Sequence, residues 1–212
     1  MHKLNLEPEL AQLFDGLHKS STQRKIKRAE RERLRVEEGS SEELLNQFYD
    51  LLVLTRRRHR VPPQPRKWFS SLRTGFGNQL NIQIALSKDV PIAGIVTICL
   101  KESLVYKYGA SNEKYFNLGG MQMLFWHAIT VAKMEGLKEV DLGRSAFQDQ
   151  GLKTFKDRLG AASTDLTYFR YPVASGENSV STGDLQSRQK LAARLPQGLM
   201  STMGRLLYRH FG

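Results

Sequence analysis

The 212-residue sequence predicts one α/β domain in which helices pack on a mixed β-sheet. Three consecutive stretches over 78–111 have the alternation or apolar content of strands and are joined by short turns, which predicts an antiparallel meander. An apolar helix over 118–136 then leads to a fourth strand over 137–143. Such a strand–helix–strand unit implies a right-handed crossover and a parallel pair. The sheet is therefore expected to combine antiparallel and parallel pairing.

Helices are expected ahead of the meander. Residues 1–18 are predicted to be a lead-in with at most a short helix. Residues 19–35 are rich in Lys and Arg and begin with helix-capping residue types, so they predict a basic helix, and a short strand follows that Gly39 closes. Leu and Phe at helical spacing predict a helix over 42–59. The prolines of "VPPQP" end it, and a shorter helix over 66–76 is expected next.

The C-terminal part continues the domain and then changes character. A short helix over 150–161 and a last strand over 163–173 complete a domain that spans 19–173. Residues 174–187 have the composition of a linker. Residues 188–212 form a basic, partly amphipathic helical tail, which packs on the core or lies on a membrane.

Charge and cysteine usage restrict the functional classes. The net charge is +11, with a pI of about 9.9, which indicates an anionic partner such as nucleic acid, nucleotide phosphates or an anionic membrane face; a simple solvated surface is the alternative. Cys99 is the single cysteine, which excludes an internal disulfide and fits a reducing compartment. The N-terminus lacks the apolar core of a secretory signal. A cytoplasmic location is expected, with binding to the inner membrane face left open.

Several chemistries find no support in the sequence. The five histidines have no metal-binding spacing, and Cys99 has no partner, so no metal site is expected. A phosphate-binding P-loop and a G-x-S-x-G nucleophile motif are both missing.

Four stretches together resemble a known family. "KIKRAERERLRVEEG", "YGASNEKYFNLGGMQMLFWHAI", "GLKEVDLGRS" and "LKTFKDRLGA" are similar to the second GNAT acyltransferase module of FemAB-like proteins. They look closest to the branch labelled BioF-like or CelD-like acetyltransferases. The resemblance covers roughly residues 19–172. FemAB-like proteins usually carry two such modules, and residues 1–18 are too few for another. A separate N-terminal GNAT module is therefore a candidate partner.

The resemblance implies a GNAT-like fold with a slot between two strands. In that fold the last meander strand and the next parallel strand diverge, and the exposed backbone groups pair with the acyl donor. Donor phosphates would lie at the N-terminus of the intervening helix, where free N–H groups favour anions. That places Gly119, Gly120 and Met121 in the donor site, although a plain turn into a helix would also explain the glycines. The usual GNAT phosphate loop is missing, so the donor is either an acyl-CoA or an aminoacyl-tRNA.

Two ionisable side chains, those of Lys156 and Asp141, are the main catalytic candidates. The resemblance implies that the pair Phe155 and Lys156 faces the transferred acyl group, with the Lys156 ammonium meeting the developing oxyanion. On sequence alone a surface lysine is the favoured interpretation of Lys156, and the resemblance makes the two interpretations equal. Asp141 lies near the end of the strand over 137–143, where it would accept a proton from the acceptor amine or orient it. The alternative for Asp141 is a bond to local backbone or a pair with Arg144.

Further polar and aromatic residues complete the expected site. Arg144 and Arg158 are predicted to bind a carboxylate or phosphate of the substrate. Tyr106 and Tyr108 alternate with Lys107, so both are expected on one face of their strand, lining the cleft or serving as core aromatics. Tyr108 is assigned a catalytic role and Tyr106 a substrate-binding role.

The sequence thus predicts an acyltransferase that acts on an amine or sugar-linked acceptor. The resemblance alone suggests cell-envelope or exopolysaccharide assembly. Aminoacyl transfer from tRNA onto peptidoglycan bridges is the first alternative, with the basic helix over 19–35 tracking phosphates. The second is an inactive module that binds RNA, an anionic membrane or a separate first module.

Overall fold

The computed structural model describes residues 1–169, and the linker and tail expected over 174–212 lie outside the described residues. The helices and helical turns are α1 Leu10–Gly16, the π-helical turn Lys19–Gln23, α2 Arg24–Arg31, α3 Glu42–Arg58, α4 Arg66–Phe76, the 3-10 turns Gly77–Gln79 and Glu113–Leu118, α5 Gly120–Met134 and α6 Gln150–Asp157. The strands are β1 His2–Asn5, β2 Arg35–Gly39, β3 Leu80–Ser87, β4 Val90–Leu100, β5 Ser103–Ser111, β6 Glu139–Gly143 and β7 Ala162–Ser163.

The seven strands form one mixed sheet in the order β2-β3-β4-β5-β6-β1-β7. Strands β2 to β5 are antiparallel neighbours, β5 and β6 are parallel, and β1 is antiparallel to both β6 and β7. The predicted meander and the predicted parallel pair are therefore confirmed. Helix α5 provides the crossover between β5 and β6.

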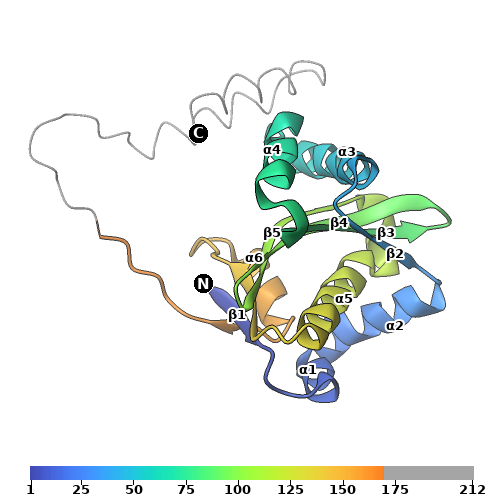
Figure 1. Cartoon of the computed structure of the whole chain (residues 1–212). Helices are drawn as coiled ribbons and strands as arrows, with labels where there is room; N and C mark the ends of the chain where they lie inside the picture. Colours follow the sequence, from blue (N-terminus) through green and yellow to red (C-terminus); the bar gives the residue numbers. More distant parts are fainter. Residues whose placement is uncertain (170–212) are drawn as a thin grey trace, which may run out of the picture.

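Helices cover both faces of the sheet, as Figure 1 shows: α3 and α4 lie on one face, and α1, α2 and α5 lie on the other. Each face has its own apolar core. One is built around Phe125 of α5 and the other around Phe48 of α3. Strand β4 contributes Ile95 to the first core and Val96 to the second. This strand is therefore buried on both faces.

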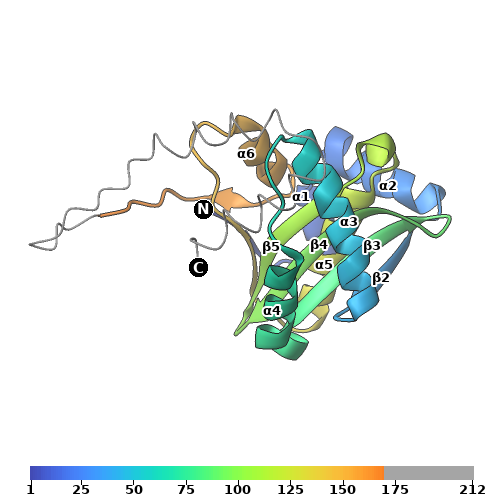
Figure 2. The same cartoon turned by 90° about the horizontal axis from the view of Figure 1, so that it is seen from above.

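The N-terminal residues belong to the sheet, although a lead-in was expected over 1–18. Leu4 pairs with Val140 of β6 and is buried in the same core as Phe125. The alternation in "HKLNL" is the signal for this strand, since His2 and Leu4 are buried while Lys3 is only partly so. Figure 2 shows the N-terminus beside α6.

Two other predicted elements differ from the structure. The basic helix begins with a π-helical turn over Lys19–Gln23, in which the His18 side chain accepts a bond from the Ser21 N–H at 3.3 Å. The strand expected over 163–173 is reduced to Ala162–Ser163 in the described part, and residues 164–169 have no regular structure. The short strand pairs only with β1, so no contact with an apolar core stabilises a longer strand here.

Candidate active site

A slot opens where β5 and β6 part. The two strands pair only at Ser103–Val105 of β5 and Glu139–Asp141 of β6. Beyond Val105, β5 runs on to Ser111 without β6 beside it. The peptide groups on this side of β5 have no strand partner within residues 1–169, so they are free to pair with an extended ligand. The expected divergence of the two strands is confirmed, and it begins three residues before Tyr108.

Helix α3 fixes the far end of β5. The Thr55 hydroxyl donates to the Ser111 carbonyl at 3.1 Å, and the Ser111 N–H donates to the same hydroxyl at 2.8 Å. The Arg58 guanidinium also donates to the Ser111 carbonyl, at 3.3 Å. These bonds hold β5 against α3 and keep it apart from β6.

A β-bulge at Lys107 sends the two tyrosines to opposite faces of the sheet. Tyr106 lies opposite Thr97 and Tyr108 lies opposite Val96, so Lys107 is an extra residue on β5. Tyr106 packs in the core under α5, while Tyr108 packs in the core under α3 and α4. The prediction of a shared face is therefore wrong, because period-two alternation fails at a bulge.

Tyr106 begins a chain of aromatic contacts that leads to α6. Its ring lies 4.8 Å from that of Phe125, which in turn lies 5.4 Å from Phe155. Burial raises the pKa of Tyr106 to about 12. A Cβ at Gly109 would lie 2.2 Å from the Tyr106 hydroxyl, so only glycine allows this packing. Phe155 is thus packed against the core under α5 through Phe125, one residue before Lys156.

Tyr108 has a hydroxyl with its proton available. The indole N–H of Trp68 on α4 donates to the Tyr108 oxygen at 2.9 Å. The Tyr108 ring also packs edge-on against Phe69 at 5.0 Å. Because a hydroxyl both accepts and donates, the bond from Trp68 leaves the Tyr108 proton to be donated to another group.

Lys156 is buried at the carboxyl end of β6, so the surface alternative is excluded. Only 3% of the residue is exposed. Its Nζ donates to the carbonyls of Gly143 at 3.1 Å and Arg144 at 3.0 Å. Burial lowers the pKa of Lys156, while the charges of Asp141 and Asp149 raise it in part. An ammonium has three protons, so one remains for a ligand.

The remaining polar candidates separate into two groups. Asp141 Oδ1 accepts a bond from the Gly143 N–H at 2.7 Å, which is the local alternative considered for it. Arg144 is exposed, and its guanidinium donates to the Tyr168 hydroxyl at 3.0 Å rather than to Asp141. Arg158 is exposed at the end of α6 and contributes its carbonyl, which accepts bonds from the His18 N–H and the Thr22 hydroxyl. Asp141 and Arg144 therefore lie at the slot with Lys156, and Arg158 lies apart.

A pocket of about 140 Å³ lies at the N-terminus of α5. Lys25, Ser111, Gly120 and Met121 are among its lining residues. Gly119 has φ of 83°, and a Cβ there would lie 2.3 Å from the Lys25 carbonyl, so glycine is needed for α2 to approach. The first turn of a helix leaves N–H groups without intrahelical acceptors, and Gly119 offers no side-chain cap. These groups and Lys25 suit a phosphate.

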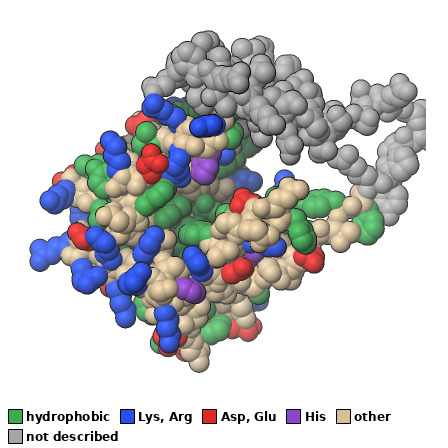
Figure 3. Space-filling view, turned by 180° about the vertical axis from the view of Figure 1, so that it is seen from behind, with side chains coloured by type: hydrophobic (Ala, Val, Ile, Leu, Met, Phe, Trp, Pro, Cys, Tyr) green, Lys and Arg blue, Asp and Glu red, His purple; other side chains and the backbone are tan. Residues whose placement is uncertain are grey.

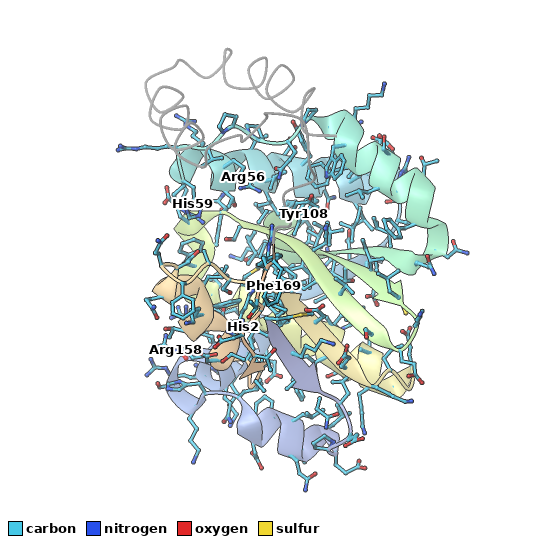
Figure 4. All side chains as sticks on the ribbon, turned by 90° about the vertical axis from the view of Figure 1, so that its left-hand side faces the viewer. His2, Arg56, His59, Tyr108, Arg158 and Phe169 are labelled. Carbon is cyan, nitrogen blue, oxygen red and sulfur yellow. The ribbon has the colours of Figure 1, made fainter. Side chains whose placement is uncertain are left out.

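Sequence reasoning missed three residues of this region. His2 is buried next to α6, and Trp68 bonds to Tyr108. Arg56 of α3 has a buried Nε that finds no hydrogen-bond partner in the described part of the chain. Figure 4 shows Arg56 on the α3 side, Arg158 on the opposite side, and Tyr108 and His2 between them. Arg56 was visible only as part of the "RRRHR" run. His2 could not be found without knowing that β1 adjoins β6.

Within residues 1–169, no group of three or more His, Cys, Asp or Glu side chains is arranged to hold a metal ion. The helices of this part of the chain are also too short or too polar to cross a bilayer.

Comparison with known proteins identifies the family. The family model described as acetyltransferase (GNAT) domain matches residues 18–157, and the chain belongs to this family of acyltransferases. No curated protein matches in sequence.

Solved structures show the same fold at low identity. FemX has a TM-score of 0.67 and 13% identity, over 76% of this chain and 58% of FemX. L-PGS from Bacillus licheniformis has a TM-score of 0.53 and 14% identity, over 76% of this chain and 56% of L-PGS. AAC(6')-Iy in complex with a CoA bisubstrate analogue has a TM-score of 0.51 and 11% identity, over 66% and 99% of the two chains. The chain spans little more than half the length of the first two.

Proposed function

We propose that this chain transfers an acyl group from an acyl-CoA donor to an amine or sugar-linked acceptor. The observation that carries the proposal is the parting of β5 and β6 beyond Val105, together with the buried Lys156 ammonium at the carboxyl end of β6. The expectation that the product enters cell-envelope or exopolysaccharide assembly rests on the resemblance to FemAB-like proteins.

The donor would bind along the slot. Peptide groups of β5 beyond Val105 would pair with its pantetheine arm, and the α5 N-terminus with Lys25 would hold its phosphates. The CoA analogue in AAC(6')-Iy, which shares this fold, supports such a donor.

The residues at the slot supply complementary functions in this scheme. The acceptor nitrogen attacks the acyl carbonyl carbon, and the third N–H of Lys156 donates a hydrogen bond to the developing oxyanion while Lys156 stays protonated. Asp141 Oδ2 takes the proton that the amine loses, since only Oδ1 is bonded to Gly143. As the carbon–sulfur bond breaks, Tyr108 gives its proton to the leaving thiolate, and the proton held on Asp141 then restores Tyr108 through solvent. Trp68 keeps that hydroxyl oriented.

An aminoacyl-tRNA donor is the second candidate. Exposed cations of α2, such as Lys27 and Arg31, support it because a helix with this charge suits a phosphate backbone. Figure 3 shows Lys and Arg gathered over part of the surface seen from behind. In the third candidate, the chain is an inactive module that binds RNA, an anionic membrane or a separate GNAT module.

Thermal unfolding with candidate donors distinguishes these functions. Coenzyme A at a hundredfold excess over its Kd would stabilise the fold by about 2.7 kcal/mol, which raises Tm by several degrees. The control is Gly120→Arg, which fills the pocket at the α5 N-terminus. Stabilisation by tRNA alone, with steep salt dependence, would favour the second candidate. If neither ligand raises Tm, the acyl-CoA proposal fails.

A further inference from the structure

His2 is a buried histidine that the mechanism above does not use. It is 2% exposed, and neither ring nitrogen has a hydrogen-bond partner among residues 1–169. A buried polar group without a partner is costly, so its retention calls for an explanation. Backbone pairing places His2 opposite Gly143, whose carbonyl accepts a bond from Lys156. His2 and Lys156 are thus buried at the same end of β6.

We propose that His2 is a positioning residue for Lys156, and that its imidazole must stay neutral for the Lys156 ammonium to remain at the slot. A protonated His2 would place a second buried cation beside Lys156. Two desolvated like charges repel strongly when they are close together, because little water screens them. This repulsion would move the Lys156 ammonium toward solvent and away from the carbonyls of Gly143 and Arg144.

The charges around His2 favour its neutral form. On α6 it faces Lys153, Lys156 and Asp157, and on β1 it faces the amino group of Met1. Burial and then Lys156 lower the pKa of His2, and Asp157 opposes them. Asp157 Oδ1 lies 3.4 Å from His2 Nε2, but its side chain is 56% exposed. Solvent therefore weakens the one contact that would stabilise an imidazolium.

The functional part of this inference rests on the proposed acyl transfer. Within that scheme, His2 makes the slot sensitive to acid: once it is protonated, the oxyanion loses its donor. The rate would then fall about tenfold for each pH unit below the pKa of His2, as for any single required deprotonation.

The first test measures the electrostatic coupling between His2 and Lys156 and needs no transfer assay. The pKa of His2 is measured by NMR titration of its ring in the wild-type chain and in Lys156→Met. We expect a pKa below the ordinary histidine value in the wild type and a rise in Lys156→Met. An unaltered His2 titration in Lys156→Met would overturn the inference. This outcome does not depend on which donor the chain uses.

The second test reads the pH profile of thiol release from acetyl-CoA. In His2→Gln, which is neutral at every pH, the step of the acidic limb that coincides with the His2 pKa measured by NMR should disappear, while the rate at pH 8 stays within threefold of wild type. His2→Phe guards against a folding defect of the glutamine variant, and His127→Gln is the matched control that keeps this step. A step at that pH that persists in both folded His2 variants would refute the positioning role. If coupling is seen by NMR but no donor is turned over, the acyl-CoA proposal fails while the coupling of His2 to Lys156 stands.

Discussion

Replacing Lys156 with Met is the sharpest test of the proposed mechanism. Methionine keeps a flexible side chain of similar length but removes the ammonium that reaches the end of β6. Loss of one preorganised oxyanion donor typically lowers kcat by about 10²- to 10³-fold, or about 3–4 kcal/mol of transition-state stabilisation. We expect a decrease of this size in Lys156→Met.

The fold should tolerate the change. The carbonyls of Gly143 and Arg144 lose their donor, at a cost of about 1–3 kcal/mol for a buried group left unpaired. Removing a buried charge that had to be desolvated offsets part of this cost. Tm should therefore change by no more than a few degrees, while the rate falls at least a hundredfold.

The assay measures thiol release from acetyl-CoA with a panel of amine acceptors, alongside thermal unfolding. Lys153→Met is the matched control, since Lys153 lies one turn earlier on α6 and its Nζ rests 4.7 Å from the Phe147 ring centroid. It should keep most of the wild-type rate. A folded Lys156→Met that retains full activity, or an equal loss in Lys153→Met, would refute the assignment of Lys156.

The pH dependence of the wild-type rate is a second test of Lys156. Burial lowers the pKa of Lys156; its amine is protonated below that pKa and loses the proton as the pH rises through it. The rate should decline on the alkaline side at a lower pH than an exposed lysine would cause. That alkaline limb should vanish from the residual activity of Lys156→Met.

Three further changes have separate outcomes. Gly119→Ala places a Cβ 2.3 Å from the Lys25 carbonyl oxygen at a residue with positive φ. The free energy of unfolding, measured by urea denaturation, should therefore fall by at least about 2 kcal/mol, and an unchanged urea midpoint would contradict this packing. Trp68→Phe removes the donor to Tyr108, and the rate should fall about tenfold with little change in Tm, as expected for about 1 kcal/mol of hydrogen bonding. The pKa of His2 is lowered on folding, so the unfolded state binds more protons near pH 6.5 than the folded state does. The free energy of unfolding should therefore rise from pH 5.5 to 7, and this rise should be smaller in His2→Gln.

The fold was predictable wherever one periodicity persists over a whole element. The helix over 66–76 and the three strands of the meander occur as expected, because each has a steady apolar spacing and a clear stop. Strand β1 could not be predicted, since four residues carry too little pattern and their pairing with β6 is a contact between positions about 140 residues apart. Its place between β6 and β7 is what brings His2 into the site.

The candidate site was predictable in its position but not in its contacts. The resemblance led to Phe155 and Lys156: Phe155 packs against Phe125, Lys156 bonds to the carbonyl of Gly143, and their roles in acyl transfer stay a prediction. The faces of Tyr106 and Tyr108 were wrong because the bulge at Lys107 depends on how β5 pairs with β4. Trp68 was missed because its bond to Tyr108 links elements that are 40 residues apart.

The two walls of the slot are held by separate sets of contacts. Strand β5 is tied to α3 through Thr55 and Ser111, while α6 is tied to the α5 core through Phe155 and Phe125. Beyond Val105 no backbone ladder joins β5 to β6 within residues 1–169, so an extended ligand can pair with β5 there without displacing a strand. The position of Lys156 relative to β5 is then set by packing on the two faces of the sheet. A mutation in either core, such as Phe125→Ala, should therefore lower the transfer rate more than the loss of stability alone explains, because it moves one wall relative to the other.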